Sequence, residues 1–539
     1  MAKWWQDRVV YQIYPRSFAD TNGDGMGDIP GIIAHLDDLC DLGIGIIWLG
    51  PLYCSPDADN GYDISDYRNI DPRYGTMDDM DRLIRKAAAR DIRLVMDLVI
   101  NHTSDEHEWF RQSRNKNSPY RDYYIWRPGK NGGPPNNWIS LFGGSCWELS
   151  DESGEYYLHL FAKKQPDLNY HNPKVIEEVK KIMRFWLDRG ISGFRCDVIN
   201  IIYKSSLEDS KKLLLKGVEY YVSQPGTHEI LRTLRREVLS GYDCFTVGET
   251  VFVTPEMGKE LCDQSRGELD MIFSFEHMET DQFLVKWFKR KFDAGRFGQA
   301  VAKWQKALEW NANYLENHDQ PRSVSRFGDD GGYWAESAKL LCLMLLTLRG
   351  TPFVYQGQEI GMTNFDFTGM NQIQDVESHN IYRFAKKLHF PASHRWRIIK
   401  KSSRDNARTP MQWTAGENAG FTTGKPWLGI NRNYTRINYA AQQNDPESIL
   451  SFYKRMIALR AGSEALKYGG FTLIKASGSL FIYEREYQGQ VFRVLLNFGE
   501  HKREAPFNGN VVVSNYGRTQ YDGLLKPWEA VVLSRGGAK

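Results

Sequence analysis

The sequence predicts an α/β protein built on a (β/α)8 TIM barrel, with a subdomain inserted after the third strand and a C-terminal antiparallel β-sandwich domain. Short apolar segments recur eight times in the first 360 residues, and helix-period segments separate several of them. This alternation predicts parallel strands, and eight repeats are the number that closes a barrel. A doubly wound open sheet would need a glycine-rich phosphate turn after the first strand, which this sequence lacks.

The predicted barrel strands run into polar or charged residues. They span residues 9–14, 44–49, 93–99, 193–197, 244–249, 269–275, 313–317 and 351–355. Amphipathic helices are predicted over residues 77–90 and 174–189, before the third and fourth strands, and over 446–461 after the last. Because functional groups of such barrels lie at the carboxyl ends of the strands, the polar residues there are the candidates for a site.

Changes of pattern along the chain set the predicted domains. The barrel is expected to comprise residues 1–103 and 173–462, with an insertion at about 363–443. Residues 104–172 are rich in Asn, Pro, Gly, Ser and Trp and too long for a loop, which predicts an inserted domain over the barrel mouth. Residues 463–539 predict the β-sandwich domain. Its alternating strands are predicted at 471–475, 480–485, 491–497 and 530–533.

The composition of the 539 residues argues against several classes of protein. The formal net charge of +2 gives no reason to expect nucleic acid or an anionic membrane as a partner. Seven cysteines without CxxC spacing argue against a disulfide framework and a zinc site, and fit a reducing cytoplasm. The N-terminus lacks the apolar stretch of a signal peptide, and the longest apolar run, 340–346, is too short for a membrane span. We therefore expect a cytoplasmic monomer.

Arg195 and Asp197 are the first candidate pair of functional residues. Side chains in a strand alternate between its faces, so both project to one side of the strand 193–197 and Cys196 to the other. A fixed cation lowers the pKa of a neighbouring carboxyl and keeps it ionised at neutral pH, which suits a nucleophile. A buried structural ion pair is the alternative.

Further polar residues follow other predicted strands. Glu249 closes the strand after that of Asp197, and neighbouring strands lie about 4.8 Å apart, so the two carboxyls can face one another across a substrate bond. Retaining glycosidases hold their carboxyls about 5 to 5.5 Å apart. Asp319 supplies a third carboxylate, and His318 and His102 are donors at the seventh and third strand ends. Taken singly, Glu249 also fits a carboxylate at a helix N-terminus. Each histidine, taken singly, also fits a polar residue at a loop junction whose hydrogen bonds are satisfied.

A glycine-containing loop after the first strand carries oxygen ligands at alternate positions. They are Asp20, Asn22, Asp24, Met26 and Asp28. The spacing resembles the first nine positions of an EF-hand calcium loop, although position twelve is Gly31 and a strand precedes the loop. The pattern predicts one structural Ca²⁺, with Mg²⁺ as a substitute; a metal-free turn rich in Asx side chains is the alternative.

Four segments in order resemble the four sequence regions of glycoside hydrolase family 13, the α-amylase family. They are Asp97-Leu-Val-Ile-Asn101-His102, Gly193-Phe-Arg195-Cys-Asp197-Val-Ile, Val247-Gly-Glu249-Thr and Glu316-Asn-His318-Asp319-Gln. Residues 165–169, 60–64 and 403–413 resemble further stretches of its oligo-1,6-glucosidase subfamily. The resemblance covers most of the chain and implies a barrel domain A, an inserted domain B and a β-sandwich domain C.

The resemblance also implies roles for the candidate residues. Asp197 would be the nucleophile, Glu249 the acid/base and Asp319 the stabiliser of the transition state. Three further side chains would surround the sugar at subsite −1: His102, Arg195 and His318.

Two residues would close the pocket of an exo-acting member of this family. Asp63 and Arg404 would clamp the 4-hydroxyl of the non-reducing end, with Arg408 as the alternative arginine. Residues 143–147 and 251–253 are expected to line the subsites beyond the cleaved bond.

Val198 bears on the linkage that is cleaved. The α-1,6-specific members of the subfamily resemble this chain in having Val directly after the nucleophile, where a β-branched side chain would narrow subsite +1. The alternative is that Val198 is only a β-former in a buried strand.

The expected activity is release of glucose from isomalto-oligosaccharides by hydrolysis of α-1,6 bonds, with no cofactor for catalysis. An α-1,4-active α-glucosidase and a sucrose isomerase or transglucosidase are alternatives, although Trp287–Asp293 lacks the Arg-rich motif of the isomerases. A third alternative, resemblance to the non-catalytic heavy chain of amino-acid transporters, would require a transmembrane segment.

Overall fold

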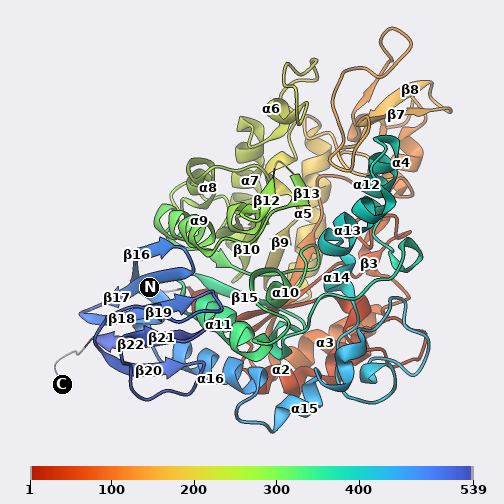
Figure 1. Cartoon of the computed structure of the whole chain (residues 1–539). Helices are drawn as coiled ribbons and strands as arrows, with labels where there is room; N and C mark the ends of the chain where they lie inside the picture. The colour runs from red at the N-terminus through yellow and green to blue at the C-terminus, as the bar shows by residue number, and fades with distance from the viewer. Residues whose placement is uncertain (1–2, 284, 536–539) are drawn as a thin grey trace.

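The computed structural model describes residues 3–283 and 285–535, and a barrel of eight parallel strands forms its centre (Figure 1). Around the barrel the order is β11 (Met271–Phe273), β10 (Phe245–Glu249), β9 (Gly193–Cys196), β5 (Arg93–Leu98), β2 (Ile46–Leu49), β1 (Val10–Ile13), β15 (Thr351–Tyr355) and β14 (Ala312–Asn313). Every hydrogen-bonded neighbour pair is parallel. The eight predicted strands and the barrel are confirmed; the seventh strand is shorter than predicted because it ends at Asn313.

Helices cover the outside of the barrel. They include α1 (Ile29–Ala34), α2 (Leu36–Leu42), α3 (Met77–Ala88), α5 (Pro173–Asp188), α7 (Pro225–Glu237), α8 (Pro255–Cys262), α9 (Ala294–Ala307), α10 (Ser323–Phe327), α11 (Trp334–Thr347), α15 (Tyr439–Gln443), α16 (Ile449–Ala461) and α17 (Glu464–Tyr468). The short α6 (Val218–Tyr221) instead packs on Trp138 and Trp147 of the segment inserted after β5. A capping box between Thr76 and Asp79 starts α3, and Met80, Leu83 and Ala87 form its buried face. Within the described part of the chain, no helix has the length and apolar character that crossing a bilayer requires.

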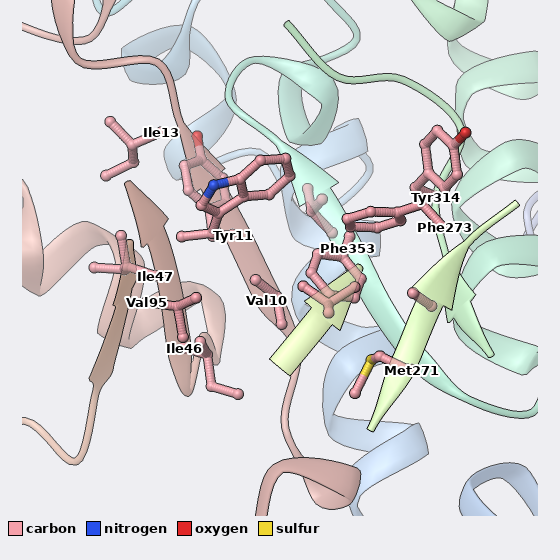
Figure 2. Packing of buried hydrophobic residues seen from close by; sticks show 14 of the residues in the cluster. Val10, Tyr11, Ile13, Ile46, Ile47, Val95, Met271, Phe273, Tyr314 and Phe353 are labelled. Carbon is pink, nitrogen blue, oxygen red and sulfur yellow. The ribbon is translucent and has the colours of Figure 1, made fainter. Parts of the chain in front are cut away.

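Apolar side chains fill the barrel and the layer between its strands and helices (Figure 2). The strands are buried on both faces, which is why their sequences are nearly continuous apolar runs. Each large side chain buried in this way contributes about 1.5–3 kcal/mol. Gly193 at the start of β9 has a φ of +149°, and a Cβ there would lie 2.1 Å from the carbonyl oxygen of Phe245. A glycine is therefore required where β9 and β10 approach.

The barrel closes between β11 and β14 through side chains. The hydroxyl of Tyr314 donates to the carbonyl of Ser274 at 3.0 Å, and His277 Nε2 donates to the carbonyl of Tyr314 at 2.9 Å. The rings of Phe273 and Tyr314 meet edge to face at 5.1 Å, as do Phe273 and Phe353 at 4.7 Å. Figure 2 shows these three rings together at the seam.

Two insertions rise over the carboxyl ends of the strands. Between β5 and α5 lie α4 (Glu108–Ser113) and an antiparallel sheet of β6 (Trp126–Arg127), β8 (Glu155–Leu158) and β7 (Trp147–Ser150). After β15 come α12 (Val376–Lys387), α13 (Ala392–Ser402) and α14 (Asp405–Arg408). In Figure 1, α12 lies beside β7 and β8, and Asn380 of α12 donates to the carbonyl of Phe142 at 3.4 Å. Two hairpins complete this side: β3 (Tyr53–Cys54) with β4 (Asp66–Ile70), and β12 (Gln282–Phe283) with β13 (Val285–Lys289).

The C-terminal part is a five-stranded antiparallel sheet. Its order is β16 (Gly470–Ser477), β17 (Leu480–Tyr487), β18 (Gln490–Asn497), β22 (Ala530–Arg535) and β20 (Asn510–Ser514). One face packs on barrel helices α9 and α11, and the other is covered by the ribbon of β19 (Arg503–Glu504) and β21 (Leu524–Leu525). The four predicted strands are present, and β19, β20 and β21 are additional.

Two buried arginines complete helix ends at this interface, and one of them, Arg485, joins the sheet to the barrel. Arg460 of α16 donates to the carbonyls of Leu346 and Leu348, both at 2.9 Å. Arg485 of β17 donates to the carbonyls of Thr347 and, at 2.9 Å, Leu466. These carbonyls belong to the last turns of α11 and α17, whose negative dipole ends favour a cation.

We expect Arg485→Met to destabilise the protein by about 3 kcal/mol, because it leaves buried carbonyls without donors. Thermal unfolding would measure the loss. Arg503→Met, an exposed substitution on β19, is the control and should change stability by less than about 0.5 kcal/mol. Equal stability of the two variants would contradict the role given to Arg485.

His277 should make stability depend on pH. Burial lowers the pKa of His277 to about 4, whereas in the unfolded chain it titrates near its ordinary value of 6.5. The unfolded state thus binds an extra proton below pH 6.5, and stability falls by about 2 kcal/mol from pH 7 to pH 5. His277→Gln, which keeps a donor for Tyr314 and does not titrate, should reduce the pH dependence of the unfolding free energy by that amount. An unchanged slope would contradict this assignment.

Candidate active site

A pocket of about 270 Å³ opens at the carboxyl ends of the barrel strands. Its acidic lining residues are Asp59, Asp197, Glu249, Asp319 and Glu377. Its basic lining residues, apart from His102, are Lys286 and Arg404. Its apolar lining residues are Leu141, Phe142, Phe161, Val198, Val251, Phe252 and Phe275.

The guanidinium of Arg195 joins three carboxyl groups at the base of this pocket. Its Nη1 lies 2.6 Å from Asp197 Oδ1 and 2.9 Å from Asp97 Oδ1. Its Nη2 lies 2.7 Å from Glu249 Oε2, and Arg195 itself is 1% exposed. These side chains stand on or directly after β5, β9 and β10, which are neighbours in the barrel. The fold therefore brings Arg195, Asp197 and Glu249 together.

The expected lowering of the pKa of Asp197 is wrong. Burial raises the pKa of Asp197 well above its ordinary value; Arg195 opposes this rise, and the charges of Glu249 and Asp97 add to it. Burial also raises the pKa of Asp97 to about 6. One guanidinium thus serves three carboxyls, and its single positive charge does not offset the burial of Asp197.

His318 is fixed as a neutral donor on the opposite side of the site. Gln12 Nε2 donates to His318 Nδ1 at 2.7 Å, so His318 Nε2 carries the proton and faces the Tyr62 hydroxyl at 2.7 Å. Burial lowers the pKa of His318 to about 3. His102, also buried, has its pKa lowered to about 4 and lines the pocket beside Gln165.

Asp319 is held ionised. Its Oδ1 lies 2.6 Å from Arg408 Nη2 and 3.4 Å from Arg404 Nη1. Desolvation would raise the pKa of Asp319, but the two guanidiniums, together with the contact of the neutral His318 at 3.4 Å, keep that pKa well below its usual range. Because His318 is neutral, the arginines supply the fixed positive charge.

Arg404 closes one end of the pocket together with Asp59. Its Nη2 lies 3.0 Å from Asp59 Oδ1, and its Nε donates to Asp375 Oδ1 at 2.8 Å. Arg408 is 0% exposed, bonds the carbonyl of His318 at 2.9 Å and is not among the lining residues. Of the two candidate arginines, Arg404 is thus the one that faces the pocket.

The structure does not place Asp63 at the pocket, which corrects the expectation for this residue. Asp63 is 0% exposed, and its carboxylate accepts hydrogen bonds from the Ser55 hydroxyl at 3.0 Å and from the backbone amides of Ala58 and Asp59 at 2.8 and 2.9 Å. It holds the loop that presents Asp59. Both aspartates flank the same motif, and spacing alone does not tell which one faces a ligand.

Val198 lies beyond the end of β9. β9 ends at Cys196, and Val198 has φ +36° and ψ +39°, a left-handed conformation that costs a β-branched residue about 1–3 kcal/mol. Its side chain lines the pocket, and its amide points toward Glu249 Oε2 at 3.4 Å. The alternative that Val198 is only a β-former within a buried strand is therefore wrong.

A further charged pair was not predicted from the sequence. Lys286 of β13 forms an ion pair with Glu377 of α12, and Trp287 Nε1 donates to Glu377 Oε1 at 3.2 Å. The two residues are distant in the chain and belong to no motif, so the sequence holds no signal that joins them.

The predicted calcium loop keeps its shape through its own hydrogen bonds. Asp20 and Asp24 accept from backbone amides two residues further on, at 3.0 and 2.8 Å. Asp28 caps α1 through the amide of Gly31 at 2.6 Å. Among residues 3–283 and 285–535, no three His, Cys, Asp or Glu side chains converge in a metal-binding group. Calcium binding stays a prediction.

Comparisons with known proteins agree with this architecture. The model of the α-amylase catalytic domain matches residues 12–469. The chain is 50% identical to an oligo-1,6-glucosidase of Parageobacillus thermoglucosidasius, with 98% of each chain covered. It is 44% identical to a trehalose-6-phosphate hydrolase of Escherichia coli, again with 98% of each covered.

Solved structures also match nearly the whole chain. The trehalulose synthase MutB of Pseudomonas mesoacidophila superposes with a TM-score of 0.96 at 41% identity, and the match covers 99% of this chain and 100% of the other. A group of carboxyls bridged by Arg195 lies at the mouth of an eight-stranded barrel, and the similarity extends over nearly the whole chain. The protein therefore belongs to the α-amylase family of glycoside hydrolases.

Proposed function

We propose that the protein is an exo-acting, retaining α-glucosidase that releases glucose from the non-reducing end of α-1,6-linked isomalto-oligosaccharides. One observation carries the proposal: Asp197 and Glu249 share Arg195 at the base of a pocket that Asp59 and Arg404 close at one end. The relatives named oligo-1,6-glucosidase support the linkage.

Asp197 and Glu249 divide the chemistry into two steps. Glu249 donates its proton to the glycosidic oxygen while the Asp197 carboxylate attacks the anomeric carbon, so the glycosidic bond breaks and a glucosyl ester forms. Glu249, now ionised, then takes a proton from water, which attacks the same carbon and releases Asp197. Two inversions give net retention. Arg195 contacts both carboxyls and stabilises the negative charge as it passes between them.

The remaining polar groups bind the sugar at subsite −1. Ionised Asp319 accepts hydrogen bonds from sugar hydroxyls and stabilises the positive charge of the transition state, and neutral His102, which lines the pocket, donates. His318, which is 1% exposed, contacts two residues that line the pocket, Tyr62 and Asp319. The Asp59–Arg404 pair offers a carboxylate and a guanidinium to the terminal 4-hydroxyl. Because this pair closes the pocket, only a chain end fits.

Val198 supports preference for the α-1,6 linkage. A side chain locked in a left-handed backbone beside Glu249 narrows the space just beyond the cleaved bond. An α-1,6 bond carries an extra methylene that sets the next sugar farther from this constriction. An α-1,4-linked sugar has no such spacer.

The pocket charge argues against phosphorylated substrates, although one relative is a trehalose-6-phosphate hydrolase. Five lining carboxyls face two cations, and each cation is already paired: Lys286 with Glu377, and Arg404 with Asp59 and Asp375. A phosphate would meet net negative charge without a free cation among the described lining residues. A neutral sugar has no such cost.

Hydrolysis is favoured over sucrose isomerisation. The structural relatives include trehalulose and isomaltulose synthases, yet two cations that follow β12 are already paired here. Lys286 pairs with Glu377, and Lys289 lies 3.1 Å from Asp281, which also binds Arg326 at 2.7 Å. These two lysines are therefore less able to orient a fructose than unpaired cations would be.

We also infer a cytoplasmic monomer. All seven cysteines carry free thiols, three of them buried, which supports a reducing compartment. Gel filtration with light scattering would measure the oligomeric state.

Asp197→Asn should lower the kcat for isomaltose at least about 1,000-fold, because the amide cannot attack the anomeric carbon. Glu249→Gln should also lose isomaltose hydrolysis but still release nitrophenol once per site from 4-nitrophenyl α-glucoside, whose leaving group needs no proton. Both variants should keep the wild-type melting temperature within about 3 °C. Wild-type turnover by a folded Asp197→Asn variant would refute the mechanism.

Initial rates on isomaltose, maltose, sucrose, panose and trehalose 6-phosphate, followed by chromatography, test the substrate class. We expect fastest glucose release from isomaltose and from the α-1,6 bond of panose, with little cleavage of trehalose 6-phosphate. Val198→Ala should raise the maltose-to-isomaltose rate ratio about 10-fold, equivalent to about 1.4 kcal/mol of steric discrimination. Isomaltulose or trehalulose formed from sucrose would instead identify an isomerase.

The calcium proposal rests on the alternate ligands at Asp20, Asn22, Asp24, Met26 and Asp28. Calcium at 100 times its Kd should stabilise the protein by about 2.7 kcal/mol relative to chelator-treated protein. Asp24→Asn should reduce that shift in melting temperature and leave the stability of the chelated protein unchanged. Identical melting with Ca²⁺ and with EGTA would show a metal-free turn.

A further inference from the structure

Phe252 is an exposed aromatic ring on a strained backbone at the edge of the pocket. Its φ is +57°, a region that bulky L-residues rarely adopt, and it is 44% exposed. Of the described aromatic residues with positive φ, the other is Trp528, which is 6% exposed and packs in the core. Phe252 lines the pocket and follows Glu249 by three residues.

The segment around Phe252 is fixed on both sides. The Thr250 hydroxyl donates to the carbonyl of Phe273 at 2.9 Å. The Asn200 amide group binds both backbone groups of Val251, donating to its carbonyl at 2.8 Å and accepting from its N–H at 3.0 Å. Thr254 caps α8 by accepting from the amide of Met257 at 3.3 Å. These contacts hold the backbone in place, so the strain at Phe252 persists.

A glycine would satisfy this backbone without strain, since it adopts positive φ freely. The ring of Phe252 also gains little from packing, because it is among the more exposed large apolar side chains. A bulky residue in a strained conformation and with an exposed ring thus contributes neither to local geometry nor to the core. Strain of this kind at the edge of an active site indicates a binding role.

We propose that Phe252 is the stacking platform for the sugar two units beyond the cleaved bond, at subsite +2, and that it gives preference for isomaltotriose over isomaltose. This inference rests on the proposed function. Val198, whose amide lies 3.4 Å from Glu249 Oε2, adjoins subsite +1, whereas Phe252 follows Glu249 by three residues and lines the same pocket with its ring exposed. The apolar face of a pyranose packs on an aromatic face, and α-1,6 links are flexible enough to bring it there.

The test compares Phe252→Gly with a matched control, Gln488→Gly. Gln488 has a φ of +47° and is exposed in the turn between β17 and β18, in the C-terminal sheet. Both substitutions relieve a left-handed non-glycine residue, so each should raise the melting temperature by about 1–3 °C. We expect Phe252→Gly to lower kcat/KM about 3- to 10-fold for isomaltotriose and less than about 2-fold for isomaltose. Gln488→Gly should change neither value.

Phe252→Trp keeps an aromatic face and should retain the preference for isomaltotriose. An unchanged isomaltotriose-to-isomaltose ratio in Phe252→Gly, or an equal loss on both substrates, would overturn the assignment to subsite +2. Wild-type protein that cleaves neither substrate would refute the proposed function instead. The two failures are therefore distinguishable in one set of rates.

Discussion

The site depends on one guanidinium that must serve three carboxyls. Arg195 sits in the interior of the barrel mouth with Asp97, Asp197 and Glu249 all within 2.9 Å of its nitrogens. Burial raises the pKa of Asp197, and the single positive charge of Arg195 only partly opposes this rise. Parallel neighbouring strands make this crowding possible, because their carboxyl ends meet at one rim.

A second network, around Asp319, has the opposite charge balance. Two guanidiniums, from Arg404 and Arg408, face this carboxylate and keep it ionised while the nearby histidines stay neutral. The pocket thus separates a proton-retaining side from a permanently charged side. The first suits proton transfer, and the second suits stabilisation of a cationic transition state.

Sequence reasoning was most accurate where local pattern determines structure. Apolar runs ending in polar residues located all eight barrel strands, and alternation placed Arg195 and Asp197 on one side. Sequence reasoning failed where contacts between residues distant in the chain determine the pKa or the position of a side chain. The pKa of Asp197 rises because the folded barrel buries its carboxyl and brings Glu249 and Asp97 beside it from other strands. Asp59 faces the pocket and Asp63 supports its loop, although both stand beside the same motif. Lys286 and Glu377 meet only after an insertion folds over the barrel.

The buried arginines at the C-terminal sheet have a consequence for the division of the chain into domains. The last turns of α11 and α17 find donors for their carbonyls in a side chain of β17. In the folded protein the sheet completes the end of α11, because the carbonyl of Thr347 finds its donor in Arg485. A chain cut after α16 would lose both α17 and this donor. Structural hydrogen bonds therefore cross the boundary between the two architectures.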